Sequence, residues 1–230
     1  MKGAFALSVL IALALVVTPC HAASITFGQF IQSDTSKAFV ETYTAGPGQN
    51  TLSVLSAAVM FQFLYPTAGP QEAAHLTLSA TTSTAAQLLG GVVVYQPNYR
   101  GTFTITRDLD GKILLTGTFG NAIGTDGGAL NGMNHGGTFT LSDSVTSPGN
   151  PLEVVFSSDF LTFMPKSLNG FSFSMAGATP SFGLNGSSFM NPFTANGTGI
   201  FSADFVPEPV SFLLLGTGLL GLGLLRRKLV

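Results

Sequence analysis

Residues 101–119, G-T-F-T-I-T-R-D-L-D-G-K-I-L-L-T-G-T-F, carry the clearest structural signal in the chain. Apolar and hydroxyl side chains alternate over 102–106, and a second apolar run follows over 113–118. Successive residues of a strand point to opposite faces, so this alternation predicts two half-buried strands. The D-L-D-G sequence between them is typical of a tight turn, and the stretch therefore predicts an antiparallel hairpin.

The same pattern recurs along the chain between Gly- and Pro-rich segments. Residues 51–65 allow one bent strand or two, with a helix over 52–60 as the alternative, and the Gly- and Asn-rich residues 120–137 predict a loop. About ten or eleven short strands without a long amphipathic helix predict an all-β fold, an antiparallel β-sandwich or jelly roll. Besides the hairpin, we predict strands over 25–31, 38–44, 51–65, 75–84, 92–95, 138–142, 152–156, 171–174 and 199–206.

The composition of this β body, residues 23–206, indicates how its two faces differ and which class of partner is not expected. The whole chain has 20 Phe, 4 Tyr and no Trp, and Phe alternates with Thr or Ser, which predicts a Phe-rich inner face and a hydroxyl-rich outer face. The body holds five basic and ten acidic residues, so its net charge is −5. Without a basic patch to follow a phosphate backbone, nucleic acid is not expected as a partner.

The N-terminus has the layout of a secretory signal peptide. Lys2 is followed by an apolar stretch over 4–17, and small residues precede Ala22, so we predict a signal peptide over 1–22. An uncleaved anchor is the alternative, and a lipoprotein at Cys20 is disfavoured because Pro19 precedes it. Cleavage after Ala22 would remove Cys20, the only cysteine, and with it thiol catalysis and disulfides.

The C-terminus, 206–230, reads V-P-E-P-V-S-F-L-L-L-G-T-G-L-L-G-L-G-L-L-R-R-K-L-V. Residues 210–225 are uncharged and rich in Leu, and as a helix they would be about 24 Å long, close to the roughly 30 Å of a bilayer core. We predict a single transmembrane helix there. The basic cluster Arg226, Arg227 and Lys228 is expected to stay cytoplasmic, which places the body on the other side.

The triplet Pro207-Glu208-Pro209 stands just before this helix, and its prolines favour an extended, accessible peptide. Triplet, apolar span and basic end together resemble the PEP-CTERM sorting signal of exported bacterial proteins. The resemblance implies that an exosortase-type membrane protease recognises the triplet, and that the lipid bilayer holds the protein until processing. It further implies a final location at the cell surface or outside the cell. The expected organisation is thus a signal peptide over 1–22, an extracytoplasmic body over 23–206 and a sorting signal over 207–230.

A ligand site in the body is predicted more weakly. Two tyrosines flank the turn before Arg100, and aromatic rings can stack on sugars; ordinary strand-edge tyrosines are the alternative. The Gly-rich stretch 124–137 adds polar side chains, and a plain surface loop is its alternative. The candidate residues for a polysaccharide contact are Tyr95, Tyr99, Asp126, Asn131, Asn134 and His135.

Metal binding and catalysis are not expected. Asp108 and Asp110 would suit calcium, but the loop lacks the EF-hand pattern and a D-G turn accounts for both residues. A glycosidase would need two nearby carboxylates, for which Asp143, Glu153 and Asp159 are available. No G-x-S-x-G motif surrounds any Ser. The leading hypothesis is a non-enzymatic surface or matrix protein without a cofactor; a glycan-binding module and a hydrolase are the alternatives.

Overall fold

The computed structural model describes residues 23–46, 48–120, 127–142, 154–163 and 168–205. The strands in these residues belong to one compact unit, Ser24–Asp204. Within the described part no helix is long and apolar enough to cross a membrane. The predicted signal peptide over 1–22, the motif over 207–209, the span over 210–225 and the basic end over 226–230 all lie outside the described residues.

The described chain consists of strands and connecting segments, with no α-helix in that part, and every pairing is antiparallel. The prediction of an all-β, antiparallel body is confirmed. The twelve strands are β1 Ala23–Gln32, β2 Phe39–Thr44, β3 Gln49–Phe63, β4 Glu72–Thr82, β5 Gln87–Leu89, β6 Val93–Arg107, β7 Ile113–Phe119, β8 Gly128–Met133, β9 Gly136–Ser142, β10 Val154–Ser157, β11 Asn169–Thr179 and β12 Phe193–Phe205.

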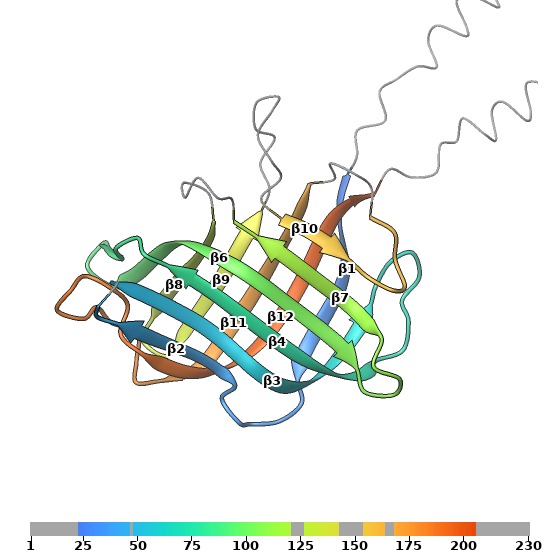
Figure 1. The fold of residues 1–230 in the computed structure, drawn as a ribbon, viewed down its shortest axis with the longest axis horizontal. Coiled ribbons are helices and arrows are strands. Elements are labelled where there is room, and N and C mark those ends of the chain that lie inside the picture. Colours follow the sequence, from blue (N-terminus) through green and yellow to red (C-terminus); the bar gives the residue numbers. More distant parts are fainter. Residues whose placement is uncertain (1–22, 47, 121–126, 143–153, 164–167, 206–230) are drawn as a thin grey trace, which may run out of the picture. The chain divides into compact units, whose positions relative to one another are not determined.

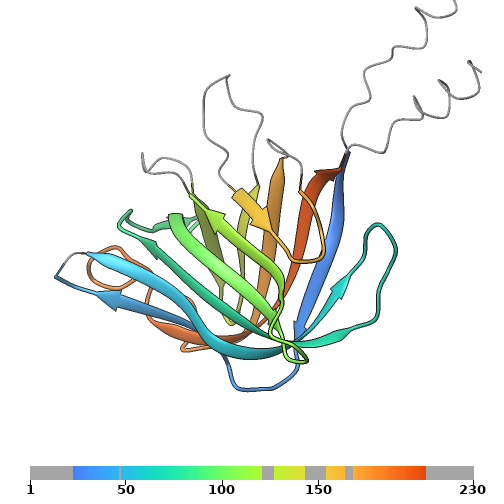
Figure 2. The same ribbon diagram turned by 45° about the vertical axis from the view of Figure 1, so that its right-hand side comes forward.

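Hydrogen bonds join all twelve strands into one sheet that closes on itself. The closed circuit runs β1–β3–β4–β6–β8–β9–β11–β12 and back to β1. β2 bridges β3 and β12, β5 pairs with β6, and β7 and β10 extend outward from β6. As Figures 1 and 2 show, β3, β4 and β6 form one layer of the unit, and they cross β9, β11 and β12 of the facing layer.

The hairpin predicted from residues 101–119 is formed by β6 and β7. Gly101 pairs with Phe119 and Ile105 with Leu115, with an irregularity after Ile105. At the turn, the amide of Gly111 donates to the carbonyl of Arg107 at 3.0 Å, and Gly111 has a φ of 70°. That left-handed conformation is why the turn ends in glycine.

The prediction of a loop over 120–137 is wrong for its second half, where β8 and β9 form a hairpin. The two-residue turn between them contains Asn134, whose φ is 52°. Gly128 and Gly132 in β8 leave space for rings, because a Cβ there would lie 2.6 Å from Phe139 and 2.2 Å from Phe182. These glycines therefore reflect packing in a strand and not the flexibility of a loop.

Of the alternatives for residues 51–65, the single bent strand is confirmed, because β3 runs continuously with an irregularity between Val54 and Ala57. The separate strands predicted over 92–95 and 101–107 are one strand, β6. Its first half pairs with β8 and its second half with β7, so β6 links two parts of the sheet.

The core consists of phenylalanine rings packed against glycines. Phe103 of one layer stacks on Phe201 of the other, with ring centroids 5.2 Å apart. The rings fit because inward-facing positions opposite them lack side chains: a Cβ at Gly197 would lie 2.1 Å from Phe39, and one at Gly199 would lie 2.2 Å from Phe30. The Phe-rich inner face expected from the alternation is therefore present, and the hydroxyl side chains are left on the outside.

Candidate functional site

Hydroxyl side chains line up across the strands on the outer faces. In the layer of β3, β4, β6 and β7, the cross-strand register aligns Ser53, Ser79, Thr102 and Thr118 in one row. Directly opposed residues of neighbouring strands lie about 5 Å apart, so the hydroxyls form a regular polar surface. This follows directly from the alternation of Thr or Ser with apolar residues in each strand.

A shallow groove of about 370 Å³ lies on the outer face of the other layer, over β9, β11 and β12. One cross-strand row of the groove is Thr140, Ser172 and Ile200, and the next contains Gly170 and Ser202. Gly170 has no side chain and leaves a depression, while Ile200 is 48% exposed. The lining residues, Thr140, Leu141, Gly170, Phe171, Ser172, Ile200 and Ser202, include no charged side chain.

The predicted ligand residue Tyr99 is not at the surface, and this part of the prediction is corrected. Its side chain is 0% exposed, and its hydroxyl donates to Glu41 Oε1 at 2.6 Å inside the core. Tyr99 falls on the inner face of β6 because it shares that face with Phe103 and Ile105. Tyr95 is half-buried in the same strand and pairs with Asn131 of β8.

Asn134 and His135 lie in the exposed turn between β8 and β9. His135 Nδ1 is 2.6 Å from the carbonyl oxygen of Ala178, and the Ala178 amide donates to the His135 carbonyl at 3.0 Å. The turn is thus fastened to the end of β11. Asp126 lies outside the described residues. The structure brings Tyr95 and Asn131 together, and it separates both from the interior position of Tyr99.

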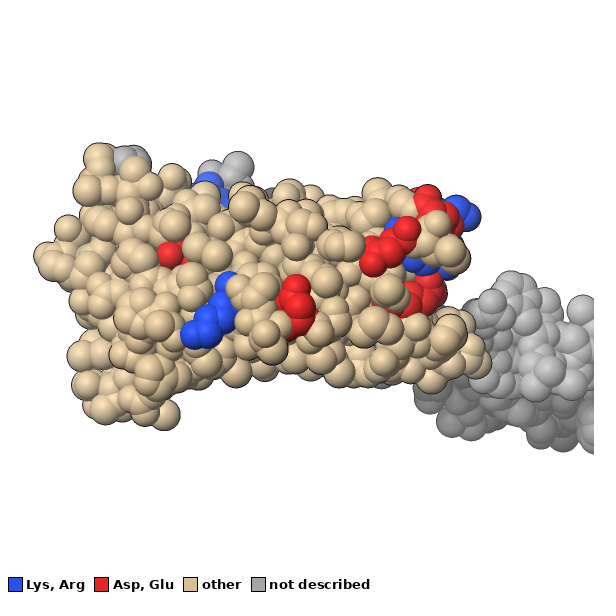
Figure 3. Space-filling model, turned by 90° about the horizontal axis from the view of Figure 1, so that it is seen from below, with Lys and Arg blue, Asp and Glu red and all other residues tan. Residues whose placement is uncertain are grey.

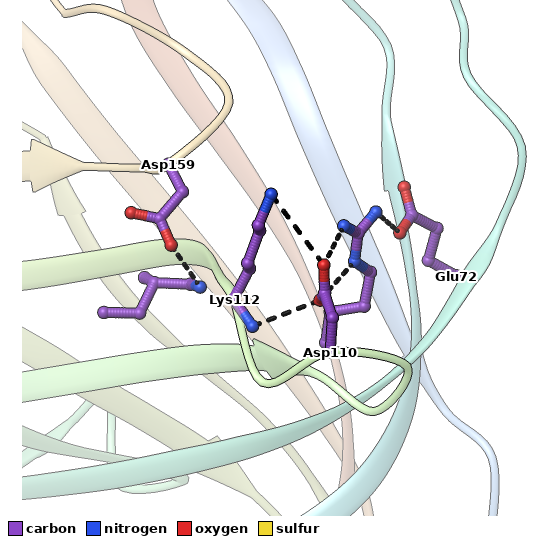
Figure 4. A network of polar contacts seen from close by, with 6 residues as sticks. Glu72, Asp110, Lys112 and Asp159 are labelled. Atoms are coloured by element: carbon purple, nitrogen blue, oxygen red, sulfur yellow. Dashed lines mark hydrogen bonds and ion pairs between the residues drawn. The ribbon is translucent and has the colours of Figure 1, made fainter.

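Charged side chains gather at one end of the face seen in Figure 3, while most of the rest of that face carries none. The cluster centres on Arg107, which bonds Asp110 at 2.6 Å and Glu72 at 2.9 Å. Figure 4 shows Glu72 and Asp110 converging from β4 and from the β6–β7 turn, with Lys112 beside them. The bonds from Arg107 hold the pKa of the Asp110 carboxyl at about 2, and Asp110 in turn raises the pKa of Arg107.

These contacts favour a structural role for the two aspartates of the turn. Asp110 Oδ1 accepts the Lys112 amide at 3.2 Å, and Asp108 Oδ1 lies 2.5 Å from His75 Nδ1. In the part of the chain that the structure describes, no three His, Cys, Asp or Glu side chains are grouped to hold a metal ion.

The carboxylates considered for hydrolysis are not assembled in the described residues. Asp159 Oδ2 accepts the amide of Ile113 at 2.8 Å, and the Asp159 amide donates to the Ile113 carbonyl at 3.0 Å, so this side chain closes the start of β7 (Figure 4). Asp143 and Glu153 lie outside the described residues. Of these three carboxylates, the structure therefore places only Asp159, whose side chain is bonded to the backbone of β7.

Sequence reasoning missed one acidic group in the interior. Glu41 is 1% exposed, and burial raises its pKa to about 8, although the hydrogen bond from the Tyr99 hydroxyl acts in the opposite direction. The sequence contained a signal for this, because Glu41 stands two residues from both Phe39 and Tyr43 and therefore shares their face of β2. The same burial, together with the Glu41 carboxyl, raises the pKa of the Tyr99 hydroxyl well above 10.

Comparison of the chain with protein-family models, with curated proteins and with solved structures finds no match.

Proposed function

We propose that the protein is a non-enzymatic bacterial surface or extracellular-matrix protein, exported through its N-terminal signal peptide and sorted through its C-terminal tail. The observation that carries the proposal is the order of Pro207-Glu208-Pro209, the apolar span and the basic cluster, paired with a signal peptide at the other end. An exosortase-type membrane protease is the partner that this arrangement requires. The bilayer holds the protein until its tail is processed.

The body supports this proposal through its surface chemistry and its core. Its outer faces carry rows of hydroxyls, and its interior is held by phenylalanine packing without a disulfide. The twelve strands of the body form one closed antiparallel sheet, and the facing parts of that sheet pack on each other through the core.

Cell fractionation combined with intact-mass measurement tests the proposal. The full chain is expressed in a bacterium that has an exosortase, next to a variant with Pro207, Glu208 and Pro209 replaced by Ala. The wild-type protein should appear outside the inner membrane with both ends shortened, and the variant should remain in the membrane fraction with its tail intact. Retention of the wild type in the cytoplasm, or equal masses for the two proteins at the C-terminus, would refute the proposal.

A second candidate function is binding of a neutral polysaccharide in the groove over β9, β11 and β12. The specific observation is that the groove combines the hydroxyls of Thr140, Ser172 and Ser202 with the exposed aliphatic side chain of Ile200, the cross-strand partner of Ser172, and that its lining carries no charge. Sugar rings present hydroxyls at their edges and apolar C–H groups on their faces, so this combination complements them. The groove thereby replaces Tyr99 as the proposed place of contact.

Affinity electrophoresis through gels containing a neutral glucan or the acidic polysaccharide alginate tests this candidate. Ser172→Phe fills the centre of the groove, and Ser79→Phe is the matched control, because Ser79 is the central serine of the row on the other layer. We expect the neutral glucan to retard the wild type and Ser79→Phe, and to leave Ser172→Phe unretarded. Equal migration of the two variants, or stronger retardation by alginate, would contradict a neutral-glycan site.

A further inference from the structure

A chain of buried polar contacts crosses the interior near β2. The Tyr99 hydroxyl of β6 donates to Glu41 Oε1 of β2 at 2.6 Å. Asn50 of β3 donates through Nδ2 to the carbonyl of Met190 at 3.1 Å, and the Met190 amide donates to Gln96 Oε1 at 3.0 Å. β3 and β6 are thus bonded to residues 181–192, which lie between β11 and β12, and β2 is bonded to β6.

Among the residues that the structure describes, no hydrogen-bond partner is found for two atoms of this cluster. They are Glu41 Oε2 and Asn50 Oδ1, and the side chains that carry them are 1% and 0% exposed. Both are oxygens, and with an ionised Glu41 both are acceptors only. A buried acceptor without a donor is rare in folded proteins because it has lost its water without compensation. The cluster is therefore short of one donor.

We propose that Glu41 is a neutral carboxylic acid in the folded protein, with its proton on Oε2 and donated within this cluster to Asn50 Oδ1. The neutral acid thereby stabilises the closed conformation of residues 181–192, and this stabilisation is lost when a rise in pH removes the proton. The proton removes the shortage, because it turns one orphaned acceptor into a donor for the other. It also removes a charge from a site where no described basic side chain acts on Glu41. The inference is independent of export and sorting.

The surroundings of Glu41 support a neutral form. Its cross-strand neighbours are Leu52 on β3 and Phe193 on β12, which are both apolar and buried. From β6 it faces the Tyr99 hydroxyl, which is the titratable group that contacts it among the described residues, and from β3 it faces the neutral amide of Asn50. Burial raises the pKa of Glu41 to about 8 from an ordinary 4.5, so the acid keeps its proton at neutral pH.

The sign of the pH effect follows from linkage. The folded state binds this proton more tightly than the open state, so the full contribution to stability is present below about pH 4.5 and is lost by about pH 8. Between these values, the equilibrium constant for any opening that exposes Glu41 to water rises by about tenfold per pH unit, and above pH 8 it levels off. The segment fastened at Met190 through Asn50 is expected to show this dependence.

Glu41→Gln is the decisive variant. The amide of Gln offers one acceptor and one donor, so it reproduces the neutral acid at every pH and cannot ionise. The control is Glu72→Gln, which makes the same substitution at a surface glutamate that is bonded to Arg107. Both variants are made in the full chain.

Two measurements distinguish the outcomes. Infrared difference spectra between pH 6 and pH 10 should show the loss of a protonated carboxylic acid in the wild type and in Glu72→Gln, and no such loss in Glu41→Gln. Amide hydrogen exchange, corrected for the intrinsic pH dependence, should show opening of residues 181–192 rising by more than tenfold between pH 5 and pH 8 in the wild type. It should remain constant in Glu41→Gln.

The proposal is overturned if the wild type lacks the acid signal at pH 6, because Glu41 is then ionised and another group supplies the missing donor. It is also overturned if Glu41→Gln keeps the pH dependence of exchange. If the acid signal is present but the exchange of residues 181–192 does not change with pH, the claim that Glu41 locks this segment is rejected. Failure of Glu41→Gln to fold at pH 5, where Glu72→Gln folds, would equally refute the neutral-acid geometry.

Discussion

Replacing Gly197 by Ala should destabilise the protein through a single contact in the core. Gly197 lies in β12 with its α-carbon facing inward, and a Cβ there would be 2.1 Å from Phe39 Cε2 and 2.6 Å from Cδ2 and Cζ. Carbon atoms in a core rest about 3.5–4.0 Å apart, so the ring would have to move by more than about 1 Å. Phe39 is 0% exposed and packs 6.3 Å, centroid to centroid, from Phe173, which restricts that movement.

The expected loss of stability is the difference between two free-energy terms. Forcing an extra carbon into a packed core costs about 1–3 kcal/mol, and a rigid aromatic neighbour places this site near the upper value. Ala also restricts the unfolded chain more than Gly does, which returns about 0.4–1 kcal/mol. We therefore expect Gly197→Ala to lower the free energy of unfolding by about 2 kcal/mol.

A double-mutant cycle with Phe39→Leu isolates the clash. Leu lacks the ring atoms that the new Cβ would meet, and by itself it leaves a cavity that costs about 2 kcal/mol. In the double mutant the added methyl group enters that cavity. The two losses should then fall short of additivity by at least about 1 kcal/mol, as expected for residues in direct contact.

Urea denaturation of the full chain, followed by circular dichroism, gives the four free energies of unfolding. Gly186→Ala is the control, since no atom lies within 4 Å of its Cβ position, and it should change stability by less than about 0.5 kcal/mol. An unchanged stability for Gly197→Ala, or strictly additive losses in the cycle, would refute the account of this core as rings packed into glycine positions.

Three further predictions concern other parts of the body. Arg107→Gln should raise the pKa of Asp110 from about 2 toward 3.8. In the wild type, Asp110 stabilises the fold above about pH 4 and this contribution is lost toward pH 2, so the variant's stability should depend less on pH in that range. An unshifted titration of the Asp110 carboxyl by NMR would contradict this. Asn169→Leu removes the donor to the Val154 carbonyl at 3.0 Å and should cost about 1–3 kcal/mol with faster amide exchange in β10, and normal exchange there would count against it. Leu55→Ser lies at the irregularity of β3 with the side chain 88% exposed, and its unfolding midpoint should stay within about 0.5 kcal/mol of the wild type; a larger loss would show that Leu55 has a packing partner.

The strands that could be located in advance are those with a clear local pattern. The hairpin of β6 and β7 was predictable because alternation and a D-G turn are both local features of the sequence. β8 was not, since Gly128 and Gly132 look like loop residues until the positions of Phe139 and Phe182 are known. Distinguishing these two kinds of glycine requires the partner ring, which is distant in the sequence for Phe182.

The candidate ligand residues show the same limit. Tyr95 and Tyr99 are four residues apart, and the sequence places them together around a turn as equally accessible. The register of β6 changes between Gln96 and Tyr99, and Tyr99 ends on the inner face against Glu41, while Tyr95 stays half-buried beside Asn131. The groove over β9, β11 and β12 could not be anticipated, because its hydroxyls come from three strands whose order is set by pairing.

The sequence alone determined the all-β class, the position of most strands and the separation of Phe from Thr and Ser, because each of these follows from the two-residue period of a strand. It also supplied the export and sorting hypothesis, which rests on local motifs at the two ends. Only the tertiary structure decided that the sheet closes through β1, β2 and β12, and that Glu41, Asn50 and Tyr99 meet in the interior. Contacts between residues far apart in the chain depend on which strands pair and in which register, and no local period encodes that choice.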